Sequence, residues 1–563
     1  MSGSDPTLAV RSSLPEQLRA PVAERLALAT EERVAERVRD ADATLWGPPG
    51  TPEIANRLAW LTIAQRMLEQ ADGLESFAAE IRAEGVRDVV LLGMGGSSLA
   101  AEVLRRSFGD QSDRPRLHVL DSTDPDWIDS VTRAIEPAQA LFLVSSKSGG
   151  TIEPLSLFAH FWPLAGERGE AFVAITDPGS GLERLAGERG FRRVFHGDPG
   201  IGGRYSALSP FGLVPAALAG IDVRGLLHGG LAAWETAVGG ERAEPAGEER
   251  PPAWLWLGAA LSALAGAGRD KLTLLPSRSL ASVGLWLEQL FAESTGKHGT
   301  GILPVAQEPL ADPDAVQARF DPEVYGPDRV FVHLPDVGDP EPELEAAARA
   351  LADAGHPLIV IPTRGPADLG RVFMLAELAV AVAGWGLGIN PFDQPNVQQA
   401  KDATNRVLAE FEAKGELPAV DDADDDALHT LLAARPPHYV ALMAYAQPSP
   451  QLDAAVAELR ATIRARTGTA STFGYGPRFL HSTGQFHKGG PPVGRFLQLL
   501  HEPGTDADIP GRPFTFATLE RAQALGDLQT LRELGLPAQR VTLGGTDLAA
   551  ALRELTARVA GLL

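Results

Sequence analysis

The sequence predicts an α/β protein with two tandem doubly wound domains, parallel sheets flanked by helices, an N-terminal helical layer and an α/β C-terminal region. Two observations predict this fold class. Apolar runs of strand length alternate with helical patterns from residue 86 to about residue 225, and the alternation begins again at residue 271. Two of the strand candidates also end in loops of glycine and small hydroxyl residues that lead into a helix.

The N-terminal part predicts helices. Residues 15–84 show helical spacing of apolar positions, interrupted by proline and glycine. Residues 1–6 have neither the basic nor the apolar region of a signal peptide. We therefore expect an N-terminal helical segment over residues 1–84.

The first alternating block predicts a parallel sheet in a domain over residues 85–240. Its strand candidates are residues 86–92, 117–120, 141–144, 172–175 and 193–195, and helices are expected from Ser98, Ile152 and Gly181. Ligands of open α/β sheets bind beyond the carboxyl ends of the strands. Both glycine-rich loops fall at that edge.

A second domain of the same kind is expected over residues 253–415, after a charged and Pro/Gly-rich linker at residues 241–252. Its strand candidates are residues 271–275, 330–334 and 358–361, and helices are expected from Leu280, Glu341 and Asp368. The apolar stretch 253–268 is shorter than a membrane span and predicts a buried helix.

Residues 416–563 predict a C-terminal α/β region. Its strand candidates are residues 439–443, 496–499 and 540–543, with helices between them. The acidic run 421–426 is typical of a solvated turn. The sequence assigns no role to residues 502–563.

Composition limits the partners and the compartment. The chain has 563 residues, 44% of them hydrophobic and 22% charged, as expected for a soluble protein of several domains. The net charge of −23 disfavours broad contact with nucleic acid or an anionic membrane. Cysteine is absent, which excludes disulfides and thiol catalysis. We expect a cytoplasmic protein, and no metal or cofactor, because no histidine or acidic pattern has metal-ligand spacing.

Two loops have the composition of a phosphate site: residues 93–98 (Gly-Met-Gly-Gly-Ser-Ser) and residues 145–151 (Ser-Ser-Lys-Ser-Gly-Gly-Thr). Such loops expose backbone N–H groups at a helix N-terminus, and glycine lets the main chain approach an anion closely. Lys147 is one of only six lysines among 50 basic residues, and its compact charge suits a phosphate oxygen.

Five short segments, taken together, resemble the glucose-6-phosphate isomerase family. They are residues 93–98, 146–153, 202–206, 291–297 and 392–401. The family has two sugar-isomerase (SIS) domains, and the segments occur here in the family order. The resemblance implies interconversion of glucose 6-phosphate and fructose 6-phosphate through an enediolate, a step of glycolysis and gluconeogenesis. It is also compatible with a homodimer.

The resemblance implies a role for each candidate residue. Its phosphate-binding positions correspond to Gly96, Ser97, Ser146, Lys147, Ser148 and Thr151. Glu293 matches the catalytic base, and its place after an apolar run fits a carboxylate that is partly desolvated. Arg204 matches the arginine that stabilises the enediolate. Gly203 and Gln394 match further substrate-binding positions.

Ring opening in this family uses a histidine and a lysine. Lys401 stands seven residues after Gln394, which is the family spacing. The histidine segment appears late in the chain, at residues 480–490, an order that resembles the isomerase half of fused transaldolase/phosphoglucose isomerases. His481 fits the bacterial pattern best, and His487 is a second candidate.

Two other functions stay open at this point. A bifunctional transaldolase/isomerase needs a Schiff-base lysine, normally in a separate eight-stranded barrel, and this chain length leaves no room for one. A non-catalytic SIS regulator would keep the phosphate loops, but such regulators usually carry a DNA-binding helical domain and lack the Glu293 and Arg204 motifs. The sequence does not show whether mannose 6-phosphate is also a substrate.

Overall fold

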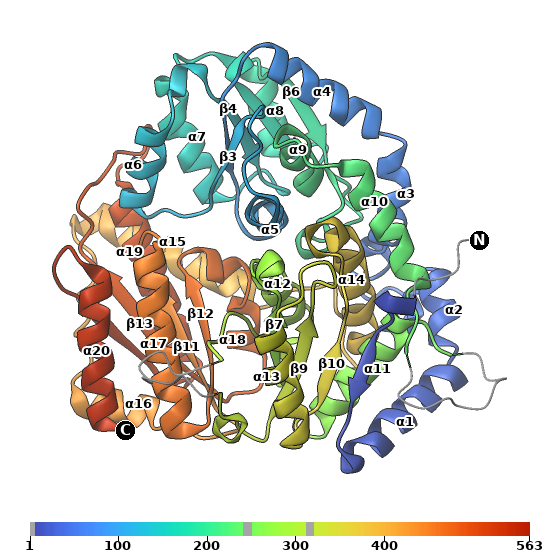
Figure 1. The fold of residues 1–563 in the computed structure, drawn as a ribbon. Coiled ribbons are helices and arrows are strands. Elements are labelled where there is room, and N and C mark those ends of the chain that lie inside the picture. The colour runs from blue at the N-terminus through green and yellow to red at the C-terminus, as the bar shows by residue number, and fades with distance from the viewer. Residues whose placement is uncertain (1–5, 240–249, 311–319) are drawn as a thin grey trace.

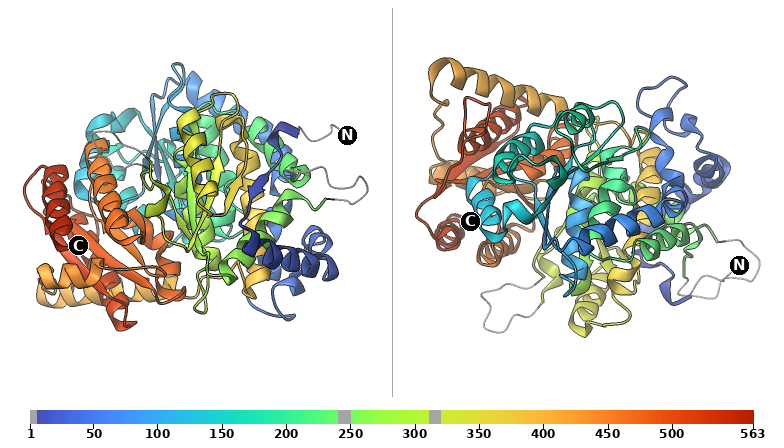
Figure 2. Two further views of the ribbon diagram at one scale, coloured as in Figure 1. Left: turned by 60° about the horizontal axis from the view of Figure 1, so that its bottom comes forward. Right: turned by 90° about the horizontal axis from the view of Figure 1, so that it is seen from above.

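The computed structural model describes residues 6–239, 250–310 and 320–563, and three separate β-sheets organise this part of the chain (Figure 1). Residues 241–249 of the expected linker lie outside the described residues. The C-terminal domain and the N-terminal helices lie at opposite ends of the molecule (Figure 2). The mixed α/β fold class is confirmed.

The first sheet is entirely parallel, with strand order β3-β2-β4-β5-β6. Its strands are β2 (Asp88–Leu92), β3 (Arg116–Leu120), β4 (Leu141–Ser145), β5 (Phe172–Thr176) and β6 (Arg193–His196). Helices α5 (Leu99–Phe108), α6 (Pro125–Ala134), α7 (Ile152–Leu164), α8 (Gly181–Glu188) and α9 (Pro210–Leu218) accompany them. The central strands are buried on both faces, which explains their continuous apolar runs. The strand order reverses between β2 and β4, so the two glycine-rich loops meet at this switch point.

The second sheet has the order β1-β10-β9-β7-β8. Strands β7 (Lys271–Pro276), β8 (Leu303–Val305), β9 (Arg329–Leu334) and β10 (Leu358–Val360) are parallel, and β1 (Arg11–Ser13) pairs antiparallel with β10. Helices α10 (Val223–Ala232), α11 (Ala253–Gly266), α12 (Val283–Thr295), α13 (Pro342–Asp353) and α14 (Leu369–Leu387) surround them. The N-terminal segment thus adds an edge strand to a distant sheet, a pairing absent from our helical prediction.

The N-terminal helices are α1 (Glu16–Glu31), α2 (Val34–Arg39), α3 (Ile63–Leu68) and α4 (Ala71–Ala83). Helix α1 packs on α11, and α11 packs on α14. By length and composition alone, residues 365–387 could cross a membrane, but 94% of their apolar window is buried inside the protein. This segment is therefore a core helix around which the second sheet and the N-terminal helices assemble.

The C-terminal region forms a third parallel sheet of its own, with order β12-β11-β13-β14. Its strands are β11 (Tyr439–Ala444), β12 (Ala470–Tyr475), β13 (Gly494–His501) and β14 (Ala538–Leu543). Its helices are α16 (Asp425–Leu432), α17 (Pro450–Thr467), α18 (Gly484–Gly489), α19 (Phe516–Glu533) and α20 (Leu548–Leu562), and the preceding helix α15 (Val397–Lys414) packs on α19. Residues 502–563 thus supply one strand and two long helices of this domain.

A buried loop after β3 joins the first sheet to the third domain. The guanidinium of Arg478 donates from Nε and Nη2 to both carboxylate oxygens of Asp121, at 2.8 and 2.7 Å. Thr123 Oγ1 donates to Gln523 of α19 at 2.7 Å. Because a buried charge is tolerated only when it is paired, these contacts fix how the third domain sits on the first.

We expect the variant Arg478→Met to lower the free energy of unfolding by about 3–5 kcal/mol, because it leaves the buried Asp121 carboxylate without its cation. Chemical denaturation measures the change. Arg558→Met is the control, since its partner Asp425 and Arg558 itself are both exposed, and it should cost less than about 1 kcal/mol. Equal losses in the two variants would contradict this account of the domain contact.

Candidate active site

The side chain of Arg204 is held rigidly by groups from the second domain and the segment that follows it. It is only 1% exposed. Its Nε donates to Ser294 Oγ at 2.8 Å, and its Nη1 donates to Gln394 Oε1 at 2.7 Å. Its Nη2 donates to the carbonyls of Pro391 and Asp393, at 2.7 and 2.9 Å. A guanidinium with its N–H groups satisfied in this way is a preorganised positive charge.

Glu293 faces this guanidinium from the last turn of α12. Its Oε1 lies 3.3 Å from Nη1 of Arg204, and its Oε2 accepts a hydrogen bond of 3.0 Å from Gln289, one turn earlier on the helix. The Glu293 side chain is 12% exposed, so it is well buried but still reachable. The same Gln289 amide donates to the carbonyl of His481 at 2.8 Å. The carboxylate therefore has a fixed position between an arginine and the histidine loop.

Lys297 fixes the loop that holds Arg204. Its ammonium donates to the carbonyls of Asn390 and Asp393 and to the Asp393 carboxylate, each at 2.6 Å. Burial lowers the pKa of Lys297 to about 7, and the nearby charge of Arg204 acts in the same direction. This lysine, which belongs to the same sequence segment as Glu293, is a support of the site.

The first glycine-rich loop lies against two other site loops without room for a side chain. A Cβ on Gly96 would lie 2.1 Å from the carbonyl oxygen of Gly203, which precedes Arg204. Gly95 has a φ of +53°, and a Cβ there would lie 2.7 Å from the carbonyl oxygen of His481. Only glycine permits both contacts. This loop is therefore the meeting point of the arginine and histidine segments.

The hydroxyl groups of the second loop gather at the start of α7. Ser146 Oγ donates to Thr151 Oγ1 at 3.1 Å and accepts from the backbone N–H of Gly149 at 3.2 Å. Ser148 is exposed. The two loops are joined because Ser145 Oγ donates to the carbonyl of Ser97 at 2.9 Å. Hydroxyls and backbone N–H groups at a helix N-terminus form an arrangement suited to phosphate.

Lys147 is engaged by acceptors of its own domain. Its ammonium forms an ion pair with Asp177 and donates to the carbonyl of Asp198 at 3.0 Å. Burial lowers the pKa of Lys147, although Asp177 opposes this shift. A bound phosphate would therefore share this lysine with Asp177.

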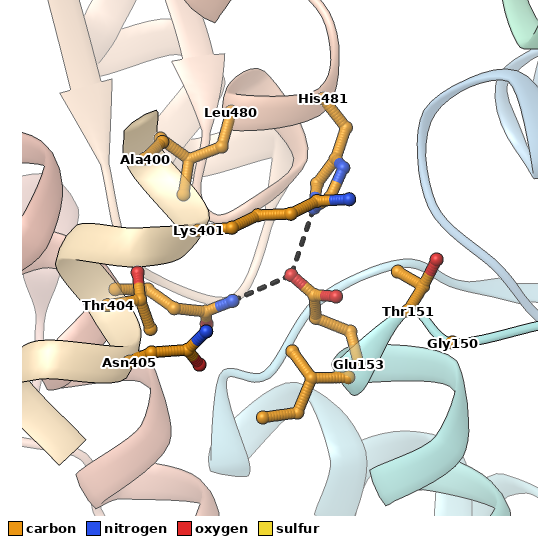
Figure 3. Close-up of a pocket in the computed structure, with 11 residues that line it drawn as sticks. Gly150, Thr151, Glu153, Ala400, Lys401, Thr404, Asn405, Leu480 and His481 are labelled. Carbon is orange, nitrogen blue, oxygen red and sulfur yellow. Dashed lines mark hydrogen bonds and ion pairs between the residues drawn. The ribbon is translucent and has the colours of Figure 1, made fainter. Parts of the chain in front are cut away.

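His481 and Lys401 line one pocket beside the second loop (Figure 3). His481 Nε2 lies 2.9 Å from Glu153 Oε1, which also accepts from Gln523 Nε2 at 2.7 Å. Burial alone would raise the pKa of Glu153, but its interactions with His481 and the charge of Lys401 hold it below its usual value. The lining residues are Gly150, Thr151, Ile152, Glu153, Ala400, Lys401, Thr404, Asn405, Leu480, His481 and Gln523.

His487 occupies a different environment. It is buried against Tyr439 and Phe496, and its Nδ1 lies 2.9 Å from the Tyr439 hydroxyl. Burial, assisted by the neighbouring Lys488, lowers the pKa of His487 to about 3. This imidazole is therefore neutral near pH 7 and packs as part of the aromatic core of the third domain.

The sequence did not predict three polar residues of the site, which are Glu153, Gln289 and Gln523. Glu153 lies in a recognised segment, and an acidic residue in the first turn of a helix was its only signal. Gln289 stands four residues before Glu293, a spacing that brings two side chains together on a helix. Gln523 lies mid-helix in α19, and no local pattern distinguishes it.

Comparison with known proteins extends these observations. The profile of the phosphoglucose isomerase family matches residues 33–301. A glucose-6-phosphate isomerase of Rubrobacter xylanophilus is 31% identical over 421 residues, covering 66% of this chain and 92% of the relative. That of Carboxydothermus hydrogenoformans is 32% identical over 400 residues, covering 62% of this chain and 84% of the relative. This chain belongs to the phosphoglucose isomerase family.

Two solved structures share the fold of this chain. The hypothetical protein TT0462 of Thermus thermophilus superposes with a TM-score of 0.56 and 27% identity, covering 71% of this chain and 100% of that protein. A glucose-6-phosphate isomerase of Chlamydia trachomatis gives a TM-score of 0.52 with 21% identity, covering 70% of this chain and 86% of that protein, which shows a shared fold.

We expect Gly96→Ala to damage this phosphoglucose isomerase family site, because its Cβ would collide with the backbone before Arg204. The resulting shift of the Gly203 backbone and of Arg204 should lower the free energy of unfolding by about 1–3 kcal/mol and reduce kcat about 100-fold. Steady-state kinetics and denaturation measure both effects. Gly187→Ala in α8 is the control, because open space surrounds its Cβ position and alanine favours a helix. Unchanged kcat in Gly96→Ala would contradict the close contact.

Proposed function

We propose that the Arg204–Glu293 pair carries out the proton transfer by which glucose 6-phosphate and fructose 6-phosphate interconvert. The observation that supports this assignment is the distance of 3.3 Å between Glu293 Oε1 and Nη1 of Arg204, whose guanidinium is held in place by hydrogen bonds. Glu293 takes the proton from C2 of the open-chain aldose and returns it to C1. Arg204 stabilises the negative oxygen of the enediolate between the two steps. The chain is an aldose–ketose isomerase of its family.

We assign ring opening to His481 and Lys401. Glu153 accepts from one nitrogen of the imidazole, which orients the ring and leaves the other nitrogen for the substrate. Lys401 lines the same pocket, so a cation and an imidazole are available to donate to and accept from the sugar ring oxygens. The buried setting of His487 favours His481 for this role.

We assign the phosphate to the two loops at the switch point of the first sheet. Ser146, Ser148 and Thr151 supply hydroxyls, and the start of α7 supplies backbone N–H groups. Gly96, Ser97 and Lys147 complete the proposed anchor. Gly203 and Gln394 lie beside Arg204 and are proposed to contact the sugar.

The substrate class is a sugar phosphate. We further propose a cytoplasmic location, no nucleic-acid or membrane partner, and a homodimer as an assembly compatible with the family resemblance. We also keep the division at residues 1–84, 85–240, 253–415 and 416–563 as a proposal. A regulator without catalysis is not favoured, because Glu293 and Arg204 face each other. A transaldolase activity is not favoured either, because the relatives are isomerases.

We expect Glu293→Gln to reduce kcat by about 100-fold or more with little change in KM, because glutamine cannot accept the carbon-bound proton. A coupled assay of glucose 6-phosphate formation measures the rate. Glu36→Gln, at an exposed position of α2, is the control and should leave the rate unchanged. Retention of more than about a tenth of the wild-type rate would exclude Glu293 as the base.

Substituting each histidine in turn shows which of the two, His481 or His487, takes part in catalysis. We expect His481→Asn to lose about 100-fold or more of kcat, whereas His487→Asn keeps the wild-type pH profile between about pH 5 and pH 8. The reason is that His487, with a pKa of about 3, does not titrate in that range. The opposite result in the two variants would transfer the catalytic role to His487.

His487 also has a predicted effect on acid stability. Its pKa falls from 6.5 to about 3 on folding, so the unfolded chain binds more protons between these values. The stability contribution of the neutral imidazole is therefore present above about pH 6.5 and is lost as the pH falls toward 3. Denaturation at several pH values should show a weaker acid dependence in His487→Asn than in the wild type. An identical dependence would contradict the buried neutral state.

A further inference from the structure

A second cavity, separate from the isomerase site, lies at the carboxyl edge of the third sheet. Its volume is about 290 Å³. Its lining includes Tyr445, His501, Glu502, Glu520, Arg521 and Arg540. Tyr445 directly follows β11 and His501 ends β13. The strand order reverses between these two strands, and such a switch point is where open α/β sheets bind ligands.

Three buried polar side chains of this cavity have atoms without a hydrogen-bond partner in the described chain. They are the hydroxyl of Tyr445, the Nε of Arg540 and the Oε1 of Glu520. The residues are 1%, 9% and 5% exposed, respectively. Leaving a buried polar atom unpaired is costly, so three of them around one cavity indicate a missing partner.

Two of these groups, Arg540 and Tyr445, are hydrogen-bond donors. Arg540 is positively charged at all relevant pH values; its Nη1 donates to the carbonyl of Val420 at 3.4 Å, and its Nε has no partner among the described residues. Burial raises the pKa of Tyr445 and that of Glu520, and the charge of Asp124 raises the latter further. A neutral phenol carries a proton to donate, and a raised pKa favours the protonated form of Glu520.

The surrounding charges are already satisfied by protein partners. Arg521 pairs with Glu502 at the solvent side of the cavity. His501 lies 3.2 Å from the Asp124 carboxylate, and Asp422 accepts from Thr542. Arg540 forms no ion pair with the residues that the structure describes, although the charge of Asp422 opposes the lowering of its pKa by burial.

We propose that this cavity binds a small organic anion, whose carboxylate or phosphate accepts hydrogen bonds from Arg540 and Tyr445. The volume suits such a molecule, since a single water occupies about 30 Å³ in the liquid. Carboxylate and phosphate share the same recognition chemistry, because a guanidinium donates to either.

The cavity and the isomerase pocket share no lining residue, although residues of α19 border both. Glu520 and Arg521 of α19 line the cavity, whereas Gln523 of the same helix donates to Glu153. Binding in the cavity therefore leaves Arg204 and Glu293 free, and the two sites can be tested independently.

The test is isothermal titration calorimetry of the full chain with two probes, malate as a hydroxylated carboxylate and glycerol 3-phosphate as a phosphate ester. The wild type should bind at least one probe with a Kd below about 1 mM. Arg540→Met and Tyr445→Phe should each weaken that binding at least about tenfold, while both retain isomerase activity. Tyr445→Phe removes only a hydroxyl, so this variant still tests the site if Arg540→Met fails to fold. Arg558→Met, an exposed arginine of the same domain, is the matched control.

The outcomes are distinct. Weakened binding in both variants supports the site, and the preferred probe identifies a carboxylate or a phosphate ligand. Absence of binding by both probes overturns the proposal. Wild-type affinity in either variant also overturns it, since it would place the probe elsewhere, as at the isomerase phosphate loops.

Discussion

The close backbone contact of Gly95 and Gly96 with two other loops is the constraint on which the site depends. A side chain at Gly96 would meet the Gly203 carbonyl, and one at Gly95 would meet the carbonyl of His481. The arginine loop of the first domain and the histidine loop of the third domain are thereby brought to one point. The glycines suggested a phosphate site from sequence, and in the structure they also allow three loops to pack together.

Hydrogen bonds then extend from this contact to every part of the site. Gln289 bridges Glu293 and the His481 carbonyl, and the His481 ring contacts Glu153 at the start of α7. Gln523 from α19 supports Glu153 from the third domain. A carboxylate, an arginine and a histidine from distant parts of one chain are therefore held in one network. Because these groups are fixed before substrate binds, little reorganisation is needed during the reaction.

The sequence predicted the strands and loops that carry strong local signals. The buried strands β2, β4 and β5 are continuous apolar runs, and the loops that follow β2 and β4 have distinctive glycines. It missed β1, β8 and β12, because β1 is short and polar, Pro304 interrupts β8, and β12 is rich in small polar residues. It also could not separate His481 from His487, because the two lie six residues apart in one sequence segment and differ only in their tertiary burial. The partners Glu153 and Gln523 likewise depend on how the third domain docks.

The most direct test is a crystal structure of the chain with a carboxylate analogue of the enediolate that carries a phosphate tail. We expect the carboxylate end between Glu293 and Arg204, and the phosphate at Ser146 and Thr151. We also expect His481 and Lys401 of the same chain beside the ligand. A phosphate bound away from these hydroxyls, or a ligand out of reach of Glu293, would contradict the account.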